Sequence, residues 1–139
     1  SVDRVSMDVL GTQDVVTRIR YSEGPRRWAG VYWQYPDGNW GDEPGKALPG
    51  VNRVSFLARG ELGGEVVEFK SGGTRGRRFR DSFERSLGSV VLAQSWTEYS
   101  IDLSGCDLSS VIGAFACVLL TPEGRDEATI YVARLEATE

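Results

Sequence analysis

Histidine is absent from the 139 residues, and methionine occurs only once. Histidine is the commonest general base and the commonest transition-metal ligand, so serine and cysteine nucleophiles lack their usual partner here. No glycine-rich loop has phosphate-binding spacing, and no two carboxylates stand out as the pair that a glycosidase places across its cleft. We therefore predict a chain without catalytic machinery of its own.

Long apolar runs and an excess of positive charge are also missing. The longest apolar stretch, Ile112 to Leu120, is far shorter than the roughly 20 residues that cross a bilayer, so we expect no membrane insertion. The 20 acidic and 16 basic side chains give a formal charge of −4, whose overall field repels nucleic acid. No signal-peptide pattern begins at Ser1, so any secretion signal is expected outside these residues.

The chain has only two cysteines, Cys106 and Cys117. Cys117 lies inside the apolar stretch, where a small buried hydrophobic residue is the ordinary interpretation. Whether the two thiols pair in a disulfide is left open by the sequence.

What the chain does contain is a repeated β pattern. Short runs alternate apolar and polar side chains and end at Gly, Pro, Asn or Asp, and no stretch has convincing helical periodicity. We predict strands at Val2 to Leu10, Val15 to Tyr21, Trp28 to Tyr35, Asn52 to Arg59, Glu65 to Ser71, Ser89 to Leu92, Thr97 to Asp102, Ile112 to Leu120 and Thr129 to Glu136. About nine to ten short strands predict an all-β, antiparallel β-sandwich or jelly roll, formed by one domain over residues 1–139.

The segment from Thr74 to Leu87 departs from this pattern, since it gathers five arginines around two phenylalanines. We expect it to be a long loop on the sandwich. A single helical turn is expected near Leu108 to Val111.

The segment from Arg27 to Trp40 is the richest in aromatic residues, with five in fourteen positions. Aromatic rings stack on the apolar faces of sugars, while amides and carboxylates bind the hydroxyls. Alternation places Ala29, Val31, Trp33 and Tyr35 on one face, which we interpret as the core, and Trp28, Gly30, Tyr32 and Gln34 on a half-solvated face. Trp40 follows a Pro-Asp-Gly-Asn turn, and it either closes one end of the sandwich or is displayed for binding.

The next two predicted strands place polar side chains opposite apolar ones. If Phe56, Val67 and Phe69 point inward, Arg59, Glu68 and Lys70 form a polar stripe on the face of Tyr32 and Gln34. The alternative interpretation is an ordinary solvated face.

Arg18 and Arg20 also project together from one predicted strand. Their guanidinium groups suit bidentate binding of a uronic acid. Alternatively, they pair with Glu23 or Asp14 and only make the surface polar.

Three sequence blocks, WAGVYWQYPDGNWGDEPG, VNRVSFLARGELGGEVVEFKSGG and WTEYSIDLSGCDLSSVIGAFACVLL, followed by TIYVARLE, resemble one known family. It comprises the galactose-binding-like β-jelly-roll modules that accompany bacterial glycoside hydrolases. The likeness runs from about Arg18 onward. The resemblance implies two antiparallel sheets and a sugar site on a sheet face or at a loop end. It also implies a secreted or extracellular protein with further domains.

Such modules often hold a structural Ca²⁺, and the family tends to have an Asp pair in its last strand. This chain has Tyr131-Val132-Ala133-Arg134-Leu135 there, so we assign no metal ligand and expect no required cofactor.

The leading hypothesis is a non-catalytic carbohydrate-binding module that holds a partner enzyme near a poly- or oligosaccharide. The candidate binding residues are Trp28, Tyr32, Gln34, Trp40, Arg59, Glu68 and Lys70, with Arg18, Arg20, Trp33 and Tyr35 as secondary candidates. The rival hypothesis is a structural or protein-interaction sandwich, in which the aromatic residues fill the core and the arginine-rich loop docks a neighbouring domain. A third hypothesis, a small polysaccharide lyase using Arg and Tyr, predicts turnover.

Overall fold

A computed structural model describes residues 1–22, 28–75, 77–120, 125 and 127–139, with the backbone alone for Trp28 and Ala29. The described residues form strands and connecting loops and contain no helix. The strands are β1 (Val2–Val9), β2 (Thr12–Ser22), β3 (Trp28–Gln34), β4 (Arg53–Gly60), β5 (Val66–Gly72), β6 (Glu84–Val91), β7 (Thr97–Asp102), β8 (Gly113–Leu120) and β9 (Glu127–Thr138). The all-β prediction is confirmed.

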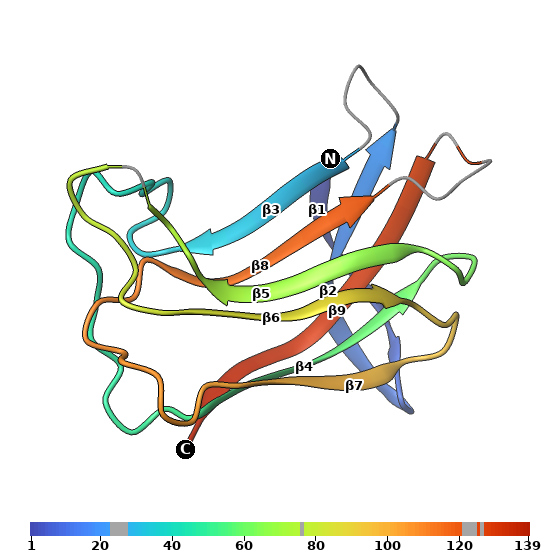
Figure 1. Ribbon diagram of the computed structural model, residues 1–139. Helices are drawn as coiled ribbons and strands as arrows, with labels where there is room; N and C mark the ends of the chain where they lie inside the picture. Colours follow the sequence, from blue (N-terminus) through green and yellow to red (C-terminus); the bar gives the residue numbers. More distant parts are fainter. Residues whose placement is uncertain (23–27, 76, 121–124, 126) are drawn as a thin grey trace.

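The strands form two sheets that face each other (Figure 1). The five-stranded sheet has the order β1-β2-β9-β4-β7, and the four-stranded sheet has the order β3-β8-β5-β6. All neighbouring strands are antiparallel. The predicted antiparallel β-sandwich is therefore confirmed. The chain crosses from one sheet to the other between β4 and β5, two strands that follow each other closely in sequence.

The core between the sheets is built on three phenylalanines. Phe56 lies on β4, Phe69 on β5 and Phe115 on β8, and each is at most 1% exposed. The ring centroid of Phe56 is 4.6 Å from that of Phe69 and 4.8 Å from that of Phe115. Tilted contacts of this kind stabilise a core beyond the burial of apolar area. The inward orientation expected for Phe56, Val67 and Phe69 is confirmed, since all three are buried.

Two local predictions are wrong. β6 begins at Glu84, so the last residues of the expected loop belong to a strand, and the expected start at Ser89 is too late. β6 is the edge of its sheet and pairs only with β5, so its polar start faces solvent and shows no apolar alternation. The expected helical turn near Leu108 to Val111 is a bend instead, after which Val111 bridges to Lys46.

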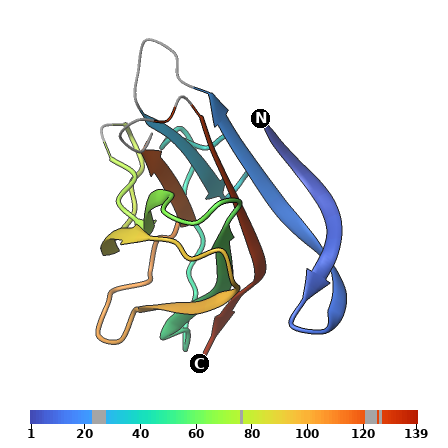
Figure 2. The ribbon, with the colours of Figure 1, turned by 90° about the vertical axis from the view of Figure 1, so that its right-hand side faces the viewer.

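The β1–β2 hairpin lies at the margin of the sandwich beside β9 (Figure 2). Its Val9 and Val16 pack with Leu57, Tyr131 and Ala133 in a second buried cluster. Those three side chains alternate with core residues along β4 and β9, so this cluster covers the outer face of the five-stranded sheet.

Both cysteines are free thiols in the structure. Cys117 is fully buried on β8, and burial raises the pKa of its thiol well above the usual range. Its interpretation as a small hydrophobic core residue is confirmed.

Candidate functional site

An aromatic corner formed by Tyr32 and Trp40 stands on the outer face of the four-stranded sheet. Tyr32 projects from β3, whose inward neighbours Val31 and Trp33 pack against the core. The ring centroids of Tyr32 and Trp40 are 4.9 Å apart at an interplanar angle of 69°, an edge-to-face contact. Trp40 is 43% exposed. This exposure fits the alternative in which Trp40 is displayed better than the one in which it closes an end of the sandwich.

Glycine and alanine make room for Tyr32 on this face. A Cβ atom on Gly30 would lie 2.7 Å from Cε2 of Tyr32, so the tyrosine ring covers the glycine. Ala116 of β8 lies directly across from Tyr32 and is 4% exposed. Small residues at these two positions leave the space that the ring of Tyr32 occupies.

Asn39 holds the loop that carries Trp40, a role that the sequence analysis did not assign. Its side chain is 3% exposed and lies inside the loop. Its Nδ2 donates to the carbonyl oxygens of Tyr35 and Glu43, at 2.9 Å each, and its Oδ1 accepts from the amides of Gly41 and Glu43. These four hydrogen bonds use every donor and acceptor that an asparagine amide usually offers. The Pro-Asp-Gly-Asn turn was the sequence signal for this residue.

The loop of Trp40 is also fastened to the arginine-rich segment. The amide of Phe79 donates to the carbonyl of Gly41 at 2.8 Å, and Nη1 of Arg77 lies 2.8 Å from Oδ2 of Asp42. Residues about 35 positions apart in sequence thus form one end of the sandwich, on the left in Figure 1.

Polar groups lie across the same sheet face. Lys70 of β5 pairs with Ala116, which pairs with Tyr32, so two strand spacings, roughly 10 Å, separate Lys70 from Tyr32. Glu68 stands two residues away on the same face and accepts a 2.6 Å hydrogen bond from Ser86. The predicted association of Glu68 and Lys70 with the face of Tyr32 is confirmed.

Arg59 does not belong to this face, and the predicted three-residue stripe is wrong. β4 lies in the five-stranded sheet, so the outward side chain of Arg59 is on the opposite side of the sandwich from Glu68. Its guanidinium carbon is 5.4 Å from the ring centroid of Tyr131. Alternation along β4 was correct, but it does not tell which sheet the strand joins.

The pKa of Tyr131, on this opposite face, predicts how the stability of the protein depends on pH. Burial, together with the hydrogen bond from its hydroxyl to Glu61, raises the pKa of Tyr131. A raised pKa in the folded state contributes stability that is present below the unfolded value of about 10 and is lost as pH rises through the folded value. We expect the free energy of unfolding to fall above about pH 10, and to fall less steeply in Tyr131→Phe. Urea unfolding at a series of pH values around and above 10 tests this prediction. Tyr35→Phe, a change at an exposed tyrosine, is the control. If the free energy of unfolding falls equally steeply with pH in the two variants, the prediction is wrong.

Arg18 and Arg20 have an acidic partner that the sequence analysis did not name. Arg18 binds both carboxylate oxygens of Asp3, at 3.0 and 2.5 Å, and Arg20 lies 3.7 Å from the same carboxylate. The hydrogen bond from Arg18 lowers the pKa of Asp3. Asp14, one of the two expected partners, pairs with Arg134 instead. The other, Glu23, lies outside the described residues. The guanidinium group of Arg18 is therefore already bound to a carboxylate of the protein.

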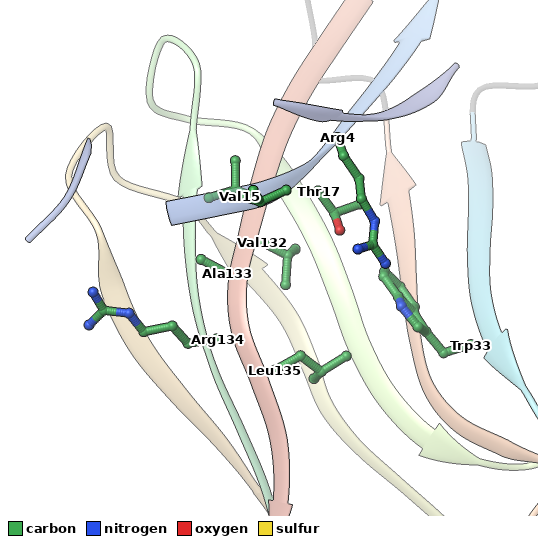
Figure 3. Close-up of a pocket in the computed structure, with 9 residues that line it drawn as sticks. Arg4, Val15, Thr17, Trp33, Val132, Ala133, Arg134 and Leu135 are labelled. Atoms are coloured by element: carbon green, nitrogen blue, oxygen red, sulfur yellow. The ribbon is translucent and has the colours of Figure 1, made fainter. Parts of the chain in front are cut away.

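Trp33 and Tyr35 differ from each other in environment. Trp33 packs on Phe115 at a centroid distance of 5.1 Å, as expected of a packing residue. It also lines a cavity of about 320 Å³ at the open side of the sandwich, where Arg4 of β1 extends toward its indole (Figure 3).

Tyr35 was expected on the core face, but it is 51% exposed, which corrects that prediction. The strand pairing of β3 shifts between Trp33 and Gln34, and β3 ends there, so alternation fails at Tyr35. Its ring lies 5.6 Å from Nζ of Lys46.

The two remaining candidates are Gln34 and Trp28. Gln34 is half-buried, and its enclosed Nε2 has no acceptor among the described residues. The backbone of Trp28 pairs with Leu120 on β8, but its side chain lies outside the described part of the structure.

The described residues offer no group of three or more Cys, Asp or Glu side chains placed to hold a metal ion. They also form no helix long and apolar enough to span a membrane. What the aromatic corner provides is an exposed indole, a supporting phenol, and nearby carboxylate and ammonium groups. Such a set can stack on an apolar ring face and bind hydroxyl groups.

No protein-family model matches the chain, and no curated protein matches its sequence. Solved structures do match its fold. The family 11 carbohydrate-binding module of the cellulosomal cellulase Lic26A-Cel5E of Clostridium thermocellum matches with a TM-score of 0.57 at 14% identity, over 99% of this chain and 82% of that one.

The family 30 module of the cellulosomal cellulase Cel9D-Cel44B of the same organism matches with a TM-score of 0.58 at 15% identity, over 100% and 82%. A family 61 module in complex with β-1,4-galactotriose matches with a TM-score of 0.54 at 16% identity, over 90% and 70%. The chain thus has the β-sandwich fold of these carbohydrate-binding modules.

Proposed function

We propose that the chain is a non-catalytic module that binds a poly- or oligosaccharide on the outer face of the four-stranded sheet. The observation that carries the proposal is the exposed indole of Trp40, in edge-to-face contact with Tyr32 and carried by a loop that the four hydrogen bonds of Asn39 hold together. An exposed tryptophan on a rigid support provides contact area at little entropic cost.

The surroundings of Trp40 support a sugar as the ligand. Apolar C–H groups of a pyranose stack on the indole, and Lys70, roughly 10 Å from Tyr32 across the same sheet face, and Glu68 beside it can bind hydroxyl groups further along a glycan. The fold is shared with modules whose names describe carbohydrate binding, and one of them is bound to β-1,4-galactotriose. The proposal needs no cofactor and no catalytic residue.

We further propose that the module works outside the cell as part of a larger protein. It would keep a linked enzyme close to its polymeric substrate, which raises the effective concentration without any chemistry in the module. A folded sandwich with one small stacking site is expected to bind each glycan site only modestly.

Replacing Trp40 by alanine tests the site. We expect Trp40→Ala to lose about 2 kcal/mol of binding free energy, roughly a 30-fold rise in Kd, because an exposed aromatic anchor of this kind is typical of binding hot spots. Trp40→Phe should retain part of the affinity. Affinity electrophoresis against β-glucans, galactans, xylans, mannans and pectins identifies the glycan, and isothermal titration calorimetry then gives Kd.

Leu62→Ala is the matched control, since Leu62 is an exposed apolar residue in the turn between β4 and β5, at the other end of the sandwich. It should leave both folding and binding unchanged. If no glycan binds the wild-type protein at high concentration, the module hypothesis is wrong and the protein-interaction hypothesis takes its place.

A further inference from the structure

The arginine-rich segment next to the aromatic corner carries guanidinium groups that form no ion pair with a described residue. Arg75, Arg78 and Arg80 are exposed, and none of them forms an ion pair with a described residue. Arg77 differs, because it pairs with Asp42. Arg78 lies over the ring of Phe79, 5.2 Å from its centroid, so Arg75 and Arg80 are the two that remain to bind an anion from solution.

The acids closest to these arginines are already committed to the backbone. Asp81 is 5% exposed, and its carboxylate accepts hydrogen bonds from the amides of Thr74, Ile112 and Gly113. One carboxylate oxygen of Asp107 accepts from the amide of Ser109. Neither acid forms an ion pair with Arg75 or Arg80, so no described side chain occupies the guanidinium groups of these two arginines.

A polar pocket of about 460 Å³ lies at this place, lined by Arg75, Arg80, Asp81, Ser82, Asp107 and Ser110. Its floor is fixed, since Oγ of Ser82 donates to the carbonyl of Asp107 at 2.6 Å and Oγ of Ser110 donates to the carbonyl of Arg80 at 2.9 Å. A volume of this size accepts a monosaccharide unit with its substituents.

The pocket belongs to the same end of the sandwich as Trp40. The segment that supplies Arg75 and Arg80 is joined to the Trp40 loop by the Phe79–Gly41 hydrogen bond and by the Arg77–Asp42 ion pair. One elongated ligand can therefore contact both elements, with its ring stacked at Trp40 and a charged group at the arginines.

We propose that the glycan bound by this chain carries uronate groups, and that Arg75 and Arg80 bind a carboxylate of the sugar in this pocket. The inference rests on the proposed function. A guanidinium matches a carboxylate with two parallel N–H···O bonds, which a neutral hydroxyl does not accept. The ligand class is thus an acidic polysaccharide containing hexuronic acid.

The net charge of −4 does not oppose this assignment. Charges further than about 8 Å away are largely screened at physiological ionic strength, so the local arginines decide what binds at the pocket. The segment from Thr74 to Arg85 contains five arginines against two acids, Asp81 and Glu84, which leaves an excess of positive charge within the segment.

The test compares polygalacturonate with the same polymer after full methyl esterification, which keeps the sugar backbone and removes the charge. The double variant Arg75→Gln/Arg80→Gln should bind polygalacturonate at least about tenfold more weakly, because each charge-assisted hydrogen bond contributes that order of affinity. Its binding to the esterified polymer should be unchanged. Arg4→Gln/Arg53→Gln removes the same charge from exposed arginines on the other sheet and should leave both affinities as in the wild type.

The outcomes separate this inference from the proposed function. Equal binding of the two polymers, or equal losses in the two double variants, overturns the uronate assignment while the Trp40 effect still decides the proposed function. Loss of binding in Arg75→Gln/Arg80→Gln without any loss in Trp40→Ala supports the pocket and overturns the stacking site. Displacement of polygalacturonate by sodium sulfate, beyond sodium chloride of equal ionic strength, would show simple anion capture and also overturn the assignment.

Discussion

Asp81→Ala should destabilise the protein by about 3 kcal/mol or more, because it leaves buried backbone amides without acceptors at a cost of about 1–3 kcal/mol each. The carboxylate of Asp81 accepts from the amide of Ile112 at 2.6 Å and from that of Thr74 at 2.8 Å, and it also receives the amide of Gly113. These bonds join the arginine-rich segment to the start of β8. We therefore expect both lower stability and a loosened pocket at Arg75 and Arg80.

Urea unfolding followed by fluorescence measures the loss. Asp81→Asn should be intermediate, since it keeps one acceptor oxygen but turns an N–H₂ group toward an amide. Asp37→Ala is the matched control, because it removes the same charge from an exposed turn residue. If Asp81→Ala unfolds at the same urea concentration as Asp37→Ala, Asp81 is not the anchor of this end.

The architecture was predictable because it depends on local signals. Alternation along β4 and β5 placed Phe56, Val67 and Phe69 inward, and all three are buried. Alternation along β3 likewise placed Trp33 toward the core and Tyr32 outward. Such patterns repeat every two residues, so a single sequence is enough to read them.

Strand order was not predictable in the same way. The error at Arg59 arose because β4 and β5 are neighbours in sequence but lie in different sheets. Nothing in the side chains of Arg59 or Glu68 reports that crossing, which depends on pairing with the distant strands β9 and β8. A face defined by residues from several strands therefore needs the topology, whereas a face of one strand does not.

Irregular backbone caused the remaining differences. The pairing shift after Trp33 turned Tyr35 outward, and an alternation argument cannot foresee such a shift. The role of Asn39 depends on four hydrogen bonds within a loop, for which the turn residues gave only a location. The partnership of Arg18 with Asp3 required the register of the β1–β2 hairpin.

Gly41→Ala should both destabilise the protein and weaken glycan binding, because Gly41 lies where the Trp40 loop meets the arginine-rich segment. Its φ of 107° is a conformation that residues with a side chain rarely adopt. A Cβ atom there would lie 2.4 Å from the carbonyl oxygen of Phe79 and 2.8 Å from Cβ of Arg77. Since the nearest atom belongs to the backbone, the two segments must separate, which breaks the hydrogen bond from Phe79 to Gly41.

Gly38→Ala measures the backbone-strain part of this effect alone, so its difference from Gly41→Ala gives the steric part. Gly38 is in the same loop and also has a positive φ, 76°, but a Cβ atom there meets nothing within 4 Å. We expect about 1–2 kcal/mol of backbone strain in Gly38→Ala, and roughly 2 kcal/mol more in Gly41→Ala from the lost hydrogen bond and the displaced segment. Urea unfolding gives the stabilities, and calorimetric titration with the glycan gives the affinities.

Equal stability and affinity in the two variants would mean that the close approach at Gly41 does not position Trp40. A loss of affinity confined to Gly41→Ala would show that stacking at Trp40 depends on the arginine-rich segment behind it.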